Sequence, residues 1–69
     1  MNEEAFNQSM RQFLKHVGVN SQREIEKAVA GAISGNTIRG DEKFPATMTL
    51  SIVGLDLEIK FDGEIRLEK

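Results

Sequence analysis

The spacing of apolar residues changes once along this chain, in the polar stretch before its single proline, Pro45. Upstream of the change, apolar residues recur every three or four positions, which is the spacing of one face of an α-helix. Downstream they alternate with polar residues, as on one face of a β-strand. The pattern therefore predicts a helical half followed by a β half. With 69 residues in total, neither half has enough apolar surface to be stable alone, so we expect a single domain over residues 1–69.

Two helices are predicted in the first half, over about residues 3–17 and 21–34. Gly18 is expected to end the first helix in a left-handed conformation. Ser21 and Glu24 have the spacing of a capping box and are expected to begin the second helix. The short connection predicts an α-hairpin.

The outer ends of this pair carry their own signals. Asn2 is expected to cap the first helix, and Gly35-Asn36 to end the second. Each helix has one apolar stripe for the core. The stripe residues are Phe6, Met10, Phe13, Leu14 and Val17 in the first helix, and Ile25, Ala28, Val29, Ala32 and Ile33 in the second.

Two strands are predicted after Pro45, over about residues 46–53 and 56–61. Proline cannot donate to a ladder, so it suits the first position of a strand. A two-residue turn at Val53-Gly54 would need positive φ at its first residue, which β-branched valine resists. We therefore prefer a four-residue loop over 53–56, which pairs Ile52 with Leu57 and Leu50 with Ile59.

The segment Asp62-Gly63 allows two interpretations. It could turn the chain into a third strand over about residues 64–68. Alternatively, the alternation of apolar residues from Leu57 to Leu67 could continue through Gly63 as one long strand. We adopt the turn in the predicted architecture. The predicted fold class is α+β, an N-terminal α-hairpin packed on one face of a small antiparallel sheet of two to three strands, in the order α-α-β-β-(β).

Composition excludes several classes of protein. The chain has no cysteine, which rules out disulfides and thiolate metal sites. Its net charge is −2 with 29% charged residues, so it has no general attraction for nucleic acid or for an anionic membrane. We see no signal peptide and no apolar run long enough to span a bilayer. The expectation is a soluble cytoplasmic protein.

Residues for enzyme chemistry are scarce. His16 is the single histidine, and tyrosine and tryptophan are absent. Ser9 would lie about 10 Å from His16 along a helix, too far to form a catalytic pair. Gly35 and Gly40 have the spacing of a phosphate-binding loop, but Asp41 stands where such a loop needs lysine. We therefore predict a non-enzyme with no catalytic, cofactor-binding or metal-binding residues and no small-molecule ligand.

Residues 13–29 offer an alternative function, because they resemble the turn and second helix of a helix-turn-helix. A small DNA-binding regulator would use Gln22, Arg23 and Lys27 as its nucleic-acid contacts. The nearby acidic residues, Glu24 among them, would repel phosphates. We therefore expect an ordinary α-hairpin here and regard nucleic acid as an unlikely partner.

Apolar residues outside the predicted core suggest a protein interface. Val53 and Leu55 lie at the predicted hairpin tip and Phe44 near the start of the first strand. Small proteins often bury such residues against a second copy. We expect a non-enzymatic interaction or accessory protein that binds a protein partner or forms a homodimer.

The chain also resembles a family of small bacterial proteins of unknown function. The resemblance implies a stand-alone domain spanning nearly the whole chain, in a bacterium, and it transfers no activity, cofactor or site residue. It rests on Phe6, Phe13-Leu14-Lys15, Gly18-Val19, the block Ser21-Gln22-Arg23-Glu24-Ile25-Glu26-Lys27-Ala28, Met48-Thr49-Leu50, Gly54-Leu55 and Gly63-Glu64-Ile65.

Overall fold

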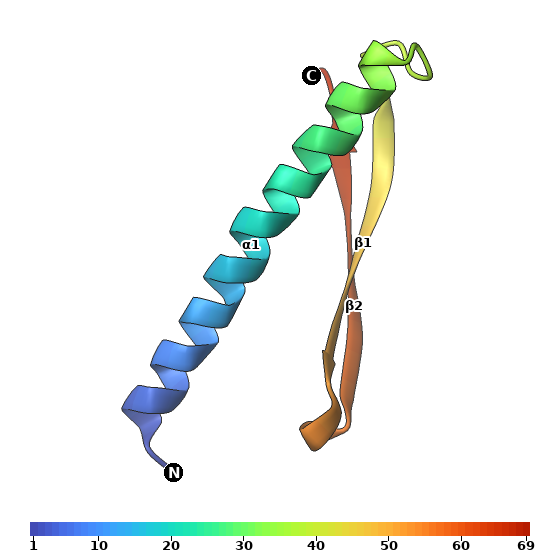
Figure 1. Cartoon of the computed structure of the whole chain (residues 1–69). Coiled ribbons are helices and arrows are strands. Elements are labelled where there is room, and N and C mark those ends of the chain that lie inside the picture. The colour runs from blue at the N-terminus through green and yellow to red at the C-terminus, as the bar shows by residue number, and fades with distance from the viewer. The chain divides into compact units, whose positions relative to one another are not determined.

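The computed structural model describes all 69 residues (Figure 1). The chain divides into two units, Met1–Thr37 and Ile38–Lys69. The first contains one long helix and the second a β-hairpin. Each unit is described by itself below.

The first unit is built on helix α1, which spans Glu3–Ser34 and is 32 residues long. At a rise of about 1.5 Å per residue its length is about 48 Å. Asn2 is the N-cap, as predicted, because its side-chain Oδ1 accepts the Ala5 N–H at 3.1 Å. Glu3 and Glu4 follow in the first turn, where negative charge is favourable.

The predicted α-hairpin is wrong, because α1 continues without a break through residues 18–21. Gly18 does not adopt a left-handed conformation and Ser21 is an interior residue rather than a cap. Gly18 costs about 1 kcal/mol relative to alanine in a helix. A break would instead leave up to four N–H and four C=O groups unpaired at two new helix ends. Continuing the helix is the less costly choice.

The C-terminal end of α1 lies at Gly35-Asn36, as predicted, but the left-handed residue is Asn36, with φ of 58°, and not the glycine. The Asn36 N–H donates to the Ile33 carbonyl at 3.1 Å, and the Thr37 N–H donates to the Ala32 carbonyl at 2.9 Å. This pair of bonds is a Schellman motif. It satisfies two carbonyls that would otherwise be free at the helix end.

The second unit is an antiparallel hairpin of β1 (Lys43–Ile52) and β2 (Leu57–Arg66). The short 3₁₀ turn η1 (Val53–Leu55) joins the strands, followed by Asp56 in a left-handed conformation. Ile52 pairs with Leu57 and Leu50 with Ile59. The predicted four-residue loop and its register are therefore confirmed.

The predicted third strand is wrong, because β2 runs straight through Asp62-Gly63. β1 begins at Lys43 rather than at residue 46, so it is long enough to pair Ala46 with Gly63 and Lys43 with Arg66. A turn at Asp62-Gly63 would forgo these pairs. The Thr47 hydroxyl also donates to Asp62 Oδ1 at 2.9 Å, which holds the segment in the sheet.

Pro45 is the third residue of β1 rather than at the predicted first position of a strand. It lies opposite Glu64. The ladder extends one pair past the strand ends, where the Leu67 N–H donates to the Glu42 carbonyl at 3.1 Å. Hydrogen-bonded and non-hydrogen-bonded pairs alternate along an antiparallel ladder. Pro45 therefore occupies a non-hydrogen-bonded pair, where the ladder does not need its missing N–H.

Candidate interaction surfaces

The apolar residues of α1 form one continuous line along the helix, which we call the helix stripe. Successive members are separated by four, four and three residues, an 11-residue repeat close to the helical period. Several large side chains on or beside this line are about half exposed, such as those of Phe6 and Phe13 at 50% and Leu14 at 56%. The members are Phe6, Met10, Leu14, Val17, Ser21, Ile25, Ala28 and Ala32, flanked by Phe13, Val29 and Ile33.

The spacing of the stripe residues indicates one unbroken helix, although the cap residues at Gly18 and Ser21 indicated a break. The steps from Leu14 to Val17, Ser21 and Ile25 stay in phase across the predicted turn. In two separate helices joined by a loop, the apolar positions of the second helix would not need to continue the spacing of the first. Ser21 is the one polar member of the line, and it is half-buried within the unit.

The hairpin separates its residues strictly between two faces. The side chains of ladder partners in an antiparallel pair point to the same side of the sheet. In this register, each apolar residue of one face is paired with another apolar residue or with glycine. On the other face polar residues are paired with polar residues, except that Pro45 is paired with Glu64. The apolar hairpin face consists of Phe44, Ala46, Met48, Leu50, Ile52, Leu57, Ile59, Phe61, Gly63 and Ile65. The polar hairpin face consists of Lys43, Pro45, Thr47, Thr49, Ser51, Glu58, Lys60, Asp62, Glu64 and Arg66.

No residue of the chain is buried. The apolar hairpin face is at best half-buried, and Phe61 is 55% exposed. Each unit thus has one apolar surface that the unit itself does not cover. Exposed apolar surfaces of this kind typically mark contacts with another protein or a membrane, or a ligand-binding groove.

The three residues predicted as an interface do not form one patch. Val53 and Leu55 share the η1 turn and are 89% and 72% exposed. Phe44 is near the start of β1, at the opposite end of the hairpin. Eight residue steps separate it from Ile52 beside the turn, which is about 26 Å at the rise of a strand.

The helix-turn-helix geometry proposed for residues 13–29 is not formed, since its turn is helical. Gln22, Arg23 and Lys27 lie on the exposed side of one continuous helix. Lys27 Nζ is 3.6 Å from Glu24 Oε2, an exposed pair one helical turn apart. Without the motif, nothing in the geometry of these residues supports contacts with DNA.

The groups that could carry other chemistry are isolated. His16 is in mid-helix, where the Asn20 side-chain amide donates to the His16 carbonyl at 2.8 Å and lies 3.2 Å from the ring Nδ1. No group of three histidine, aspartate or glutamate side chains is placed to bind a metal ion. No helix of the chain has both the length and the apolarity needed to cross a membrane.

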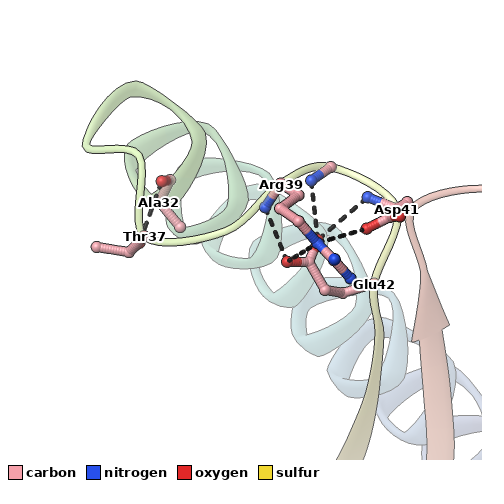
Figure 2. A network of polar contacts seen from close by, with 6 residues as sticks. Ala32, Thr37, Arg39, Asp41 and Glu42 are labelled. Carbon is pink, nitrogen blue, oxygen red and sulfur yellow. Dashed lines mark hydrogen bonds and ion pairs between the residues drawn. The ribbon is translucent and has the colours of Figure 1, made fainter.

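Glu42 is the best-organised polar residue of the connector before β1 (Figure 2). Its carboxylate accepts the N–H groups of Arg39 at 2.8 Å, Gly40 at 2.8 Å and Asp41 at 3.1 Å. The N–H groups of Arg39 and then Gly40 lower the pKa of Glu42 below its usual value. No sequence pattern marks this cluster, because its members are ordinary loop residues. Its role is to fix the turn that leads into the hairpin.

Comparison with known proteins identifies a family but no function. The profile described as "Family of unknown function (DUF6494)" matches residues 1–68 of the chain. No curated protein and no solved structure matches the chain. The predicted resemblance to a family of small proteins of unknown function is therefore confirmed.

Proposed function

The chain belongs to the DUF6494 family, and we propose that it is a small non-enzymatic interaction or accessory protein whose two apolar surfaces are covered by protein. One observation carries this proposal: neither unit buries any residue by itself, although each separates apolar from polar residues. An exposed apolar face is costly in water, and a contact that covers the face removes this cost.

The lengths of the two surfaces support a partner beyond the chain's own hairpin. The helix stripe extends from Phe6 to Ile33, which is about 40 Å along the helix axis. The apolar hairpin face extends from Phe44 to Ile52, which is about 26 Å. One hairpin face is therefore too short to cover the whole stripe.

Sedimentation velocity from about 1 µM to 1 mM, with parallel titration of the dye anilinonaphthalene sulfonate, tests this function. We expect either concentration-dependent association or a monomer that binds the dye on its free apolar surfaces. A strict monomer that does not bind the dye would contradict the proposal. In that case the two apolar surfaces would have to be covered by other parts of the same chain.

A matched pair of variants on α1 locates the contact. Leu14→Gln removes an apolar side chain from the helix stripe and is expected to reduce association or dye binding. Val19→Gln makes a similar change on another face, about 140° around the helix, where Val19 is 42% exposed. We expect Val19→Gln to behave like the unmodified chain. Equal effects of the two variants would show that the stripe is not the contact surface.

A further inference from the structure

The two edges of the hairpin differ in what they offer to another strand. The position of the Leu67–Glu42 hydrogen bond means that the odd-numbered residues of β1 and the even-numbered residues of β2 direct their backbone groups outward. On β1 one of these residues is Pro45, so that edge lacks a donor. β2 contains no proline, and every outward residue from Glu58 to Arg66 keeps both its N–H and its C=O.

Building on the proposed function, we infer that a second copy of this chain binds the outer edge of β2, antiparallel to it and about a twofold axis at Asp62. The two hairpins then form one sheet in the order β1-β2-β2-β1. Four strands with one apolar face are far more stable than an isolated hairpin. The pairing also joins the two apolar hairpin faces into one surface.

The charges on β2 are self-complementary in this register. Glu58 lies opposite Arg66 of the second copy, and Lys60 lies opposite Glu64 of the second copy. The twofold axis repeats each pair, so each dimer has four cross-strand pairs of opposite charge. Opposite charges directly across a ladder are stabilising and like charges are destabilising. Within one chain, Arg66 Nε is 2.9 Å from Glu64 Oε1, so both groups already point to this face.

Neighbouring registers are less favourable. An axis at Phe61 would place Lys60 opposite Asp62 but also Glu58 opposite Glu64, so its two attractive pairs are offset by two repulsive ones. An axis at Gly63 would place Lys60 opposite Arg66 and Asp62 opposite Glu64. Registers between these would bring the apolar face of one hairpin onto the polar face of the other. The charge pattern thus selects the axis at Asp62.

Gly63 provides a second, independent observation. A Cβ at this position would meet nothing within 4 Å, and Gly63 does not have a positive φ, so the hairpin itself does not require glycine there. Glycine inside a strand often marks a close approach by another group. In the proposed register Phe61 of the second copy lies directly opposite Gly63, in a non-hydrogen-bonded pair where side chains are closest. The missing side chain leaves room for the aromatic ring.

The one unfavourable pair is Asp62 with its own copy on the axis. The Thr47 hydroxyl donates to Asp62 Oδ1 at 2.9 Å and draws the carboxylate toward β1, away from the axis. Asp62→Asn keeps this acceptor and removes the repulsion. We expect this variant to dimerise several-fold more tightly, and a weaker dimer would overturn the register.

Hydrogen exchange on the unmodified protein provides a direct test. In a lone hairpin the outward amides of both strands face water. In the proposed dimer the amides of Lys60, Asp62 and Glu64 become protected as concentration rises, while those of Thr47 and Thr49 on the outer edge of β1 stay unprotected. Protection on β1 alone, or on neither edge in an associated sample, would overturn the inference.

Charge reversal tests the partner and the register together. Lys60→Glu and Glu64→Lys each turn two attractive pairs of the homodimer into repulsive ones, so each variant alone should dimerise on the order of tenfold more weakly. Mixing the two variants in equal amounts restores attraction between unlike chains, and the sedimenting mass should rise again toward that of a dimer. A mixture that stays as dissociated as the separate variants would overturn the proposal.

Lys43→Glu is the matched control, since it reverses the same charge on the same face but on the proline-bearing strand. We expect its dimerisation to match that of the unmodified chain. If the unmodified chain associates but neither Lys60→Glu nor Glu64→Lys changes its mass, the β2 pairing fails and the proposed interaction function stands. If the unmodified chain is a monomer that does not bind the dye, both fail.

Discussion

The helix and the hairpin are alike in their side chains and differ in their backbones. Both present one apolar and one polar face, and neither contains a buried residue. Except at its capped ends, α1 satisfies its N–H and C=O groups within the element. The hairpin satisfies only the inward half of its backbone groups and leaves two edges facing outward. Both units therefore present an apolar face, and only the hairpin also offers a backbone edge.

This difference explains where each unit is protected. A long amphipathic helix can be exposed to water without pairing wrongly through its backbone. An exposed strand edge is a template for any other strand, and proteins commonly block it with proline or charge. Pro45 removes one N–H donor from the outer edge of β1, whereas the outer edge of β2 keeps all its donors and carries charges of both signs, which we propose select a second copy of the chain. In the proposed dimer, this asymmetry directs pairing to the edge of β2 and away from the edge of β1.

The largest expected effect tests whether the two apolar surfaces are equally covered. Leu50 is half-buried opposite Ile59, and Leu50→Ala should lower the free energy of unfolding by about 2 kcal/mol, at the low end of the range for buried leucines because Leu50 is only partly covered. Leu14→Ala on the more exposed helix stripe should cost less. Thermal and urea unfolding measure both, with Thr49→Ala on the polar face as a control expected to stay within about 0.5 kcal/mol. A larger loss for Leu14→Ala would reverse the comparison.

The next effect concerns the continuity of α1. Gly18→Ala should stabilise the chain by about 1 kcal/mol, because alanine is the better residue in a helix interior and a Cβ at Gly18 would meet nothing within 4 Å. Ser21→Ala should also be stabilising, by a smaller amount. Circular dichroism during urea unfolding would measure both. If Gly18 were a left-handed cap and Ser21 an N-cap, both changes would instead be destabilising.

Each unit has one non-glycine residue with positive φ, Asn36 at 58° and Asp56 at 53°. Glycine adopts this region without strain, so Asn36→Gly and Asp56→Gly should each stabilise the chain by about 0.5 kcal/mol. The corresponding alanine variants should be less stable by about 1 kcal/mol. Melting temperatures of the four variants would show whether the helix end or the hairpin turn bears more strain. No difference between glycine and alanine at either position would contradict the backbone assignment.

The smallest effect is at Glu42. Its folded pKa is lowered by the Arg39 and Gly40 N–H groups. The carboxylate therefore contributes stability at pH values above its unfolded pKa, and this contribution is lost as the pH falls through the folded pKa, below the ordinary value of 4.5. Amide chemical shifts of Arg39 and Gly40 followed from pH 7 to pH 2 should report this titration. Glu42→Gln should abolish it, and a midpoint at or above 4.5 would contradict the geometry.

Much of the hairpin could be predicted from particular residues. The stiffness of Val53 against positive φ selects the four-residue loop, and the alternation from Leu57 to Leu67 is visible without a structure. Asp62-Gly63 misled the prediction because the pair is a common turn signal. Which signal wins depends on whether β1 extends back to Lys43 to provide partners, and that is a property of the pairing rather than of the segment.

The helix shows the same limit. Asn2 and Gly35-Asn36 mark true ends, since no apolar phase continues beyond them. Gly18 and Ser21 carry equally good cap chemistry, yet the stripe continues past them in phase. Cap residues show that a helix could end at a position, but they do not show that it ends there. The cost of two new unpaired helix ends decided the matter.

By itself the sequence determined the two periods, the order of helix before strands, the outer helix caps and the register of the hairpin, because these follow from local spacing and backbone preferences. Only the tertiary structure decided that α1 is one helix and that β2 passes through Gly63. It also decided that Pro45 lies in a non-hydrogen-bonded pair, where its missing N–H would face outward from β1. Those outcomes depend on which backbone groups find partners along the whole element. For β2 the partners lie in β1, distant in the chain, so the segment Asp62-Gly63 does not encode the outcome by itself. For α1 the partners are four residues apart, and the outcome depends on the whole stripe rather than on the local cap residues.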